Sequence, residues 1–153
     1  MTQPTRTGEA QPAAEKLLES WLQAINRGDV DGIAECYSDD IVVFAAIMAL
    51  EIAGKAPYRQ HWHDCLAVLS EPLRFEIRQR QLFVDTASAY VSALVHCSCR
   101  DEQGNLQGGW MRLSQHLRQI DGQWRIVHEH FSVPFDMPSG KVLFDLEPAD
   151  RAA

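Results

Sequence analysis

Apolar residues in the first half of the chain recur at the spacing of α-helices. The pattern over residues 13–27 ends at the Asn26-Arg27-Gly28 stretch, which predicts a helix of about four turns. Asp29 is a typical N-cap for a short second helix that ends at Tyr37. A third helix is expected to start near Pro57 and continue to Ser70. The first half therefore predicts three helices.

In the second half, apolar and polar residues alternate with a period of two, as in half-buried strands. An Asp121-Gly122 dipeptide between two such runs is a typical two-residue hairpin turn. A further β-rich run, residues 41–45, precedes Gly54 and can form an early hairpin with residues 50–52. The main strands are expected at residues 73–80, 88–100, 109–120 and 123–133.

This order of elements predicts an α+β fold in which helices cover one face of a bent antiparallel sheet. We expect one domain over residues 13–136. Residues 1–12, rich in Thr, Gln and Pro, are expected to form a disordered N-terminal tail. Residues 137–153 are expected to form an extended C-terminal tail, docked through the apolar triplet 142–144.

Composition narrows the classes of function. The 153 residues carry 14 Lys and Arg against 21 Asp and Glu, a net charge of −7. An acidic chain lacks the basic surface of a nucleic-acid-binding protein, and no apolar run approaches the ~20 residues of a membrane span. The four cysteines lack the spacing of a disulfide scaffold, so we expect reduced thiols in a cytoplasmic protein.

Four short segments carry a family resemblance: Asn26-Arg27-Gly28-Asp29, Tyr37-Ser38-Asp39-Asp40-Ile41, Gly54 with Tyr58-Arg59, and the run from Asp121 to Asp136. They resemble the nuclear transport factor 2-like superfamily, in its SnoaL-like, ketosteroid-isomerase-like branch. The resemblance implies a cone-shaped, strongly curved antiparallel sheet wrapped around three N-terminal helices and open at one end into an apolar cavity. It also implies a homodimer formed through the outer face of the sheet.

Ketosteroid isomerases use a carboxylate base and an oxyanion hole formed by a tyrosine and a protonated aspartate. Alignment through the shared motifs places the base at Ala45, the tyrosine at Trp21 and the aspartate near Gln115. None of the three residue types is retained. The resemblance therefore implies the fold without this isomerase mechanism, although Gln115 can still donate a hydrogen bond to a ligand.

On the last strand, the resemblance implies that Arg125, Val127, Glu129, Phe131 and Val133 point into the cone. A buried Glu129 would serve as a general acid or base, or as a ligand anchor; the alternative is a structural ion pair with an arginine. The expected ligand-binding residues are Trp21, Tyr58, Trp62, Gln115 and Phe131, although aromatic residues at helical spacing are also typical of a core.

Alternation places Trp124, Ile126, His128 and His130 on the opposite, outer face of the same strand. The His-x-His spacing is a weak metal signal, and we expect interface histidines, with no metal and no cofactor. Cys65 is expected to pack in the core, since no base lies at a fixed spacing from it.

Two functions remain open from the sequence. The first is a binding or interaction module, in which a dimeric cone holds a small apolar or polycyclic molecule in its cavity or serves as an assembly domain. The second is an enzyme, such as an isomerase, cyclase or dehydratase of a polycyclic or lactone-like substrate, with Glu129 or a histidine as general base.

Overall fold

A computed structural model describes residues 7–69 and 71–150 of the chain. Helix α1 spans Thr7–Arg27 and therefore begins within the segment that was predicted to be a disordered tail. Ala10 is fully buried, as is Ala14 one turn later, so packing extends the helix past Pro12. The prediction of disorder is wrong for residues 7–12, and residues 1–6 lie outside the described residues.

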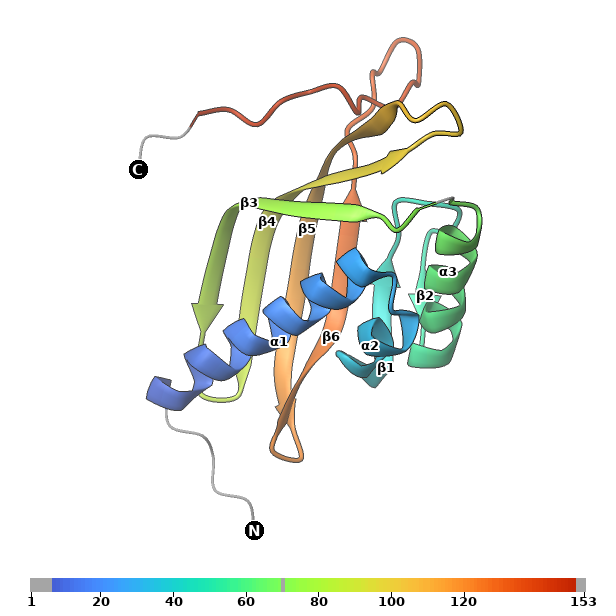
Figure 1. Ribbon diagram of the computed structural model, residues 1–153. Coiled ribbons are helices and arrows are strands. Elements are labelled where there is room, and N and C mark those ends of the chain that lie inside the picture. Colours follow the sequence, from blue (N-terminus) through green and yellow to red (C-terminus); the bar gives the residue numbers. More distant parts are fainter. Residues whose placement is uncertain (1–6, 70, 151–153) are drawn as a thin grey trace.

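Two short helices complete the helical layer. Helix α2 spans Val30–Glu35, and the Asp29 carboxylate caps it by accepting a 2.9 Å hydrogen bond from the Gly32 N–H. Helix α3 spans Lys55–Ala67 and follows the short strand β2, Ile52–Ala53. In Figure 1, α1 crosses one face of the sheet, with α2 and α3 beside its C-terminal end.

Six strands form one sheet in the order β2-β1-β6-β5-β4-β3. Strand β1 pairs in parallel with β6 and all other neighbours pair antiparallel, so the cone-shaped sheet is mixed rather than wholly antiparallel. The hairpin between β5 and β6 has positive φ at both Asp121 and Gly122, as a type I′ turn requires. The bounds of the other strands are β1 Tyr37–Phe44, β3 Arg74–Val84, β4 Ser88–Arg100, β5 Leu106–Ile120 and β6 Gln123–Ser132.

A β-bulge in β6 changes which of its side chains face the core. Leu117 pairs with Ile126 and His116 pairs with His128, which leaves Val127 as the extra residue. Trp124 and Ile126 are therefore buried together with Glu129 and Phe131. The predicted outward orientation of Trp124 and Ile126 is wrong, because a strict period of two does not continue through a bulge.

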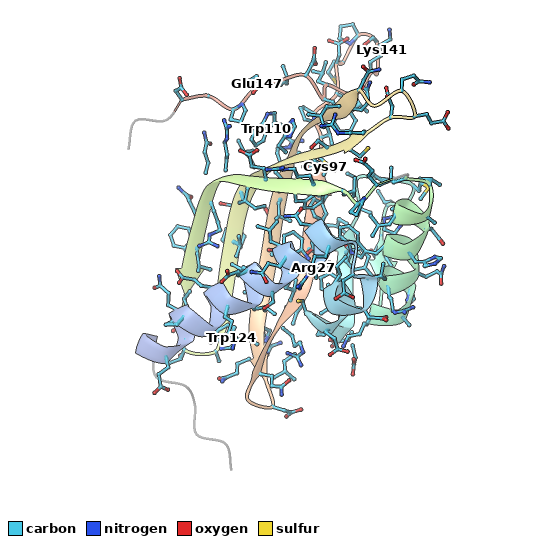
Figure 2. All side chains as sticks on the ribbon, viewed as in Figure 1. Arg27, Cys97, Trp110, Trp124, Lys141 and Glu147 are labelled. Atoms are coloured by element: carbon cyan, nitrogen blue, oxygen red, sulfur yellow. The ribbon has the colours of Figure 1, made fainter. Side chains whose placement is uncertain are left out.

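The C-terminal segment packs back onto the sheet of the same chain. Phe135 forms a β-bridge with Val142, and the Trp110 N–H donates to the Phe144 carbonyl at 3.4 Å. The indole N–H of Trp110 donates to Glu147 at 3.2 Å, and Figure 2 shows the two side chains facing each other where the segment crosses the sheet. The tail therefore packs against β5.

Among residues 7–69 and 71–150, none of the helices combines the length and the apolar character needed to cross a membrane.

Candidate functional site

Glu129, near the end of β6, lies in the centre of the molecule with no exposed surface. Its Oε2 accepts a 2.7 Å hydrogen bond from the Gln115 amide, its cross-strand partner on β5. Its Oε1 accepts from the Tyr37 hydroxyl at 3.0 Å and from the Tyr58 hydroxyl. Three elements thus supply donors to one buried carboxylate.

The Tyr37 hydroxyl connects this carboxylate to two indoles. Tyr37 is the first residue of β1, and its oxygen accepts from the Trp21 Nε1 at 3.0 Å and from the Trp62 Nε1 at 3.1 Å. Since both indoles donate to it, the hydroxyl proton is directed to Glu129. The six side chains form one buried network, which runs from α1 through β1 and α3 to β5 and β6.

Burial determines the ionisation of the network. Desolvation raises the pKa of Glu129 from its usual 4.5 to about 7, although the hydrogen bonds from Tyr58, Gln115 and Tyr37 oppose the rise. Desolvation and the Glu129 charge both raise the pKa of Tyr37 and of Tyr58 well above 10. Because all three hydrogen-bond partners of Glu129 are neutral, the alternative prediction of an ion pair with an arginine is wrong.

The first cavity lies between α3, the end of β1 and the sheet. Its open volume is about 60 Å³. Tyr58 and Trp62 line it from α3, and Phe131 lines it from β6, as predicted for a ligand cavity. Ala45, at the base position of a ketosteroid isomerase, also lines it and offers no carboxylate. The remaining lining residues are Ala46, Ile47, His61, Cys65, Leu73, Phe75, Cys97 and Met111.

The second cavity lies between α1 and strands β3, β4 and β5, and Trp21 and Gln115 line it. The sequence predicts one cone cavity for these two residues and for Tyr58 and Trp62, whereas the structure places the two pairs at different cavities. Trp21 stacks on Phe131 at 6.4 Å between ring centroids and meets Phe75 edge-on at 6.1 Å. Since both phenylalanines line the first cavity, this aromatic cluster divides the interior of the cone.

One thiol and one imidazole lie next to each other in the wall of the first cavity. The Cys65 Sγ lies 3.6 Å from the His61 Nε2, one helical turn away, and both side chains line the cavity. Burial raises the pKa of the Cys65 thiol and lowers that of His61, so both are neutral at pH 7 and the thiol is not activated. Within the described parts of the chain, no three His, Cys, Asp or Glu side chains are grouped to hold a metal ion.

Tyr37 belongs to this buried network although the sequence pattern does not indicate it. The pattern predicts that Tyr37 ends the second helix, because the polar Ser38-Asp39-Asp40 stretch after it is typical of a turn. In the structure these residues form a bulged part of β1, between the pairs Tyr37–Ile126 and Val42–His128. The one available signal was the β-propensity of tyrosine directly before that stretch.

Comparisons with known proteins agree with this architecture. The model of the SnoaL-like domain family matches residues 14–136. An NTF2-like protein of unknown function from Pseudomonas putida KT2440 is 39% identical, with a TM-score of 0.84 over 94% of this chain and 99% of that chain.

Two more distant structures share the fold alone. A candidate dehydratase of the NTF2-like family from Streptomyces avermitilis is 13% identical, with a TM-score of 0.71 over 83% of this chain and 97% of that one. A candidate scytalone dehydratase from Novosphingobium aromaticivorans DSM 12444 is 15% identical, with a TM-score of 0.68 over 79% and 81%. No curated protein matches the chain.

Proposed function

The chain belongs to the SnoaL-like domain family, and we propose that it binds a small apolar molecule with one aromatic ring in the first cavity. The observation that carries this proposal is a cavity walled by aromatic and aliphatic side chains from α3 and four strands. Tyr58 and Trp62 offer ring faces, and Met111 offers a polarizable thioether, all of which favour an aromatic guest.

The volume of the cavity favours one ring over several. A buried cavity of ~150 Å³ binds benzene, so an open space of about 60 Å³ accepts one ring only after small shifts of the lining side chains and is far too small for several rings. A polycyclic ligand would have to displace the cluster of Trp21, Phe75 and Phe131. We therefore narrow the polycyclic class expected from the sequence to single-ring compounds.

Toluene tests the proposal in protein labelled with 5-fluorotryptophan. The four tryptophans give four fluorine resonances, which are assigned by replacing each tryptophan in turn with phenylalanine. Since Trp62 lines the cavity, we expect toluene to shift its resonance in a saturable manner.

A matched pair of variants at Cys65 controls this experiment. Cys65→Phe places a ring inside the cavity and should abolish the toluene-dependent shift, whereas Cys65→Ser retains the volume and should preserve it. Absence of a saturable Trp62 shift in the wild type would overturn the proposal, as would an unchanged shift in Cys65→Phe.

A second candidate function, general acid–base catalysis, is favoured by the contact between Tyr58 and Glu129. Tyr58 lines the first cavity, and its hydroxyl donates to a carboxylate whose pKa is near 7. A substrate proton would pass to the Tyr58 oxygen while the Tyr58 proton passes to Glu129. Proton abstraction of this kind underlies the isomerase, cyclase or dehydratase activities considered from the sequence.

Ring opening of 5-nitrobenzisoxazole, which requires only a base to remove one proton, tests this second candidate. We expect the wild type at pH 8 to exceed both Glu129→Gln and Tyr58→Phe in rate, with Glu102→Gln, in an exposed turn, as the matched control. Equal rates in the wild type and Glu129→Gln would remove Glu129 from the mechanism.

We also propose that a second copy of the chain is the partner of the outer sheet face. A row of side chains crosses this face through the cross-strand pairs Phe83–Tyr90, Tyr90–His116 and His116–His128, and Phe44 packs on His128 at 4.8 Å. Phe83 is 62% exposed and Tyr90 43%, and such exposed aromatic residues are enriched at interfaces.

Sedimentation equilibrium at micromolar concentration tests this partner. We expect a dimer that Tyr90→Glu dissociates and that Ser20→Glu, on the exposed surface of α1, leaves intact. A monomeric wild type would contradict the proposal.

A further inference from the structure

We propose that the second cavity is a separate binding site for an aliphatic alcohol, whose hydroxyl donates a hydrogen bond to the side-chain oxygen of Gln115. This site does not depend on the function proposed for the first cavity. Three features of the structure support it: the apolar walls, an unpartnered buried acceptor and the charges at the rim.

The walls of the second cavity are mainly aliphatic. The open space is about 430 Å³, on the same measure as the first cavity, so it accepts a longer guest. Flexible alkyl chains suit such walls, because the free energy gained on their burial depends on the apolar area removed from water and not on the orientation of a ring. The apolar lining side chains are Leu18, Trp21, Leu22, Ile77, Val91, Ala93 and Leu113.

Gln115 supplies a buried acceptor at the inner end. It lines the cavity while being only 1% exposed, and its Oε1 has no hydrogen-bond partner among the described residues. The orientation of the amide is determined by its other end, because Nε2 donates to Glu129 at 2.7 Å. An unsatisfied buried carbonyl oxygen is costly, so a ligand that donates to it gains affinity.

The rim selects against charged ligands. Glu15 and Glu19, one turn apart on α1, line the cavity with exposed side chains, and Arg80 is the basic residue opposite. Two carboxylates against one guanidinium disfavour an anion such as a fatty acid. An ammonium group would have to lose its hydration to reach Gln115, and this costs much more free energy than the desolvation of a neutral hydroxyl.

Hexan-1-ol and its isomer 1-methoxypentane test the proposal as a matched pair. Both have seven heavy atoms, but only the alcohol can donate a hydrogen bond. In 5-fluorotryptophan-labelled protein at pH 8, where Glu129 is mainly ionised, we expect hexan-1-ol to shift the Trp21 resonance in a saturable manner. We expect the ether to bind about tenfold more weakly, because it leaves the Gln115 oxygen unpaired.

Variants locate the binding. Ala93→Leu fills the second cavity and should abolish the Trp21 shift, whereas Ser92→Leu, on the opposite face of β4, should retain it. Cys65→Phe should remove the toluene response of Trp62 and leave the hexan-1-ol response of Trp21 unchanged. The two sites can therefore fail independently of each other.

Three results would overturn this inference. The first is absence of a saturable Trp21 shift up to the solubility of hexan-1-ol. The second is equal affinity for the ether, which would remove Gln115 from recognition; this comparison uses the wild-type protein and does not depend on the folding of any variant. The third is a shift that persists unchanged in a folded Ala93→Leu variant.

Discussion

Glu129 illustrates at the scale of one residue how burial and hydrogen bonding compete. Desolvation disfavours the carboxylate, whereas three neutral donors favour it. Desolvation is the larger effect, so the side chain changes charge near pH 7 and not near 4.5. The network is therefore balanced between two protonation states at physiological pH.

This balance predicts that stability depends on pH through Glu129. Because the pKa is about 7 in the folded protein and near 4.5 in the unfolded chain, the folded state holds the proton more tightly. The contribution of Glu129 to the free energy of unfolding is fully present below pH 4.5. As the pH rises through 7 the free energy of unfolding falls by about 3 kcal/mol. Urea unfolding between pH 4.5 and 8.5 should show this loss in the wild type and not in Glu129→Gln. Parallel profiles would contradict the prediction.

Tyr37→Phe is a second test at this scale. Loss of the hydroxyl leaves the indole N–H groups of Trp21 and Trp62 unpaired and removes one donor from Glu129. We expect a loss of about 3 kcal/mol in the free energy of unfolding, since each unpaired buried donor costs ~1–3 kcal/mol. The matched control Ser20→Ala, which removes a hydroxyl from the exposed surface of α1, should change stability by less than about 0.5 kcal/mol. Equal effects of both substitutions would refute the structural role of the Tyr37 hydroxyl.

At the scale of elements, irregular positions place the site. The bulge at Val127 brings Glu129 and Phe131 to the core face together with Ile126, and the bulge in β1 separates Tyr37 from the regular pairing that starts at Val42. Bulges turn side chains without ending the strand. The two irregular segments lie on adjacent strands, so the network forms where regular pairing is interrupted.

The cap of α2 carries a prediction at the same scale. Asp29→Ala removes the acceptor for the Gly32 N–H and should lower the free energy of unfolding by about 1 kcal/mol, the usual value of an N-cap. Thermal unfolding checks this prediction, and Asp40→Ala, which replaces an exposed side chain of β1, is the control. A loss no larger than that of the control would show that water replaces the cap.

At the scale of the whole molecule, the aromatic cluster divides the cone and the C-terminal segment covers one end of the sheet. The segment is held through Trp110 and Phe144, and also by Gln79, whose amide donates to the Ala149 carbonyl at 2.7 Å. These contacts reach β5 and β3 at once. The tail therefore ties together two strands that are not neighbours in the sheet.

Gly109→Ala tests the docking of the tail. A Cβ at this position would lie 2.2 Å from the Phe144 carbonyl oxygen, too close for any real contact, so the tail must move. We expect faster hydrogen exchange at the Trp110 N–H, which donates to that carbonyl. Gly8→Ala, where a Cβ meets nothing within 4 Å, is the matched control. Unchanged exchange would show that the tail is not held at this point.

Local periodicity and backbone preference are enough to predict the helices and strands, the α+β class, the Asp29 cap and the Asp121-Gly122 turn from the sequence. The sequence also identified Glu129 as a buried carboxylate. The folded structure was needed to show where α1 starts, where the bulges lie, what Tyr37 contacts and that the interior holds two cavities. These features depend on packing between segments far apart in the chain, which a strict local period cannot predict.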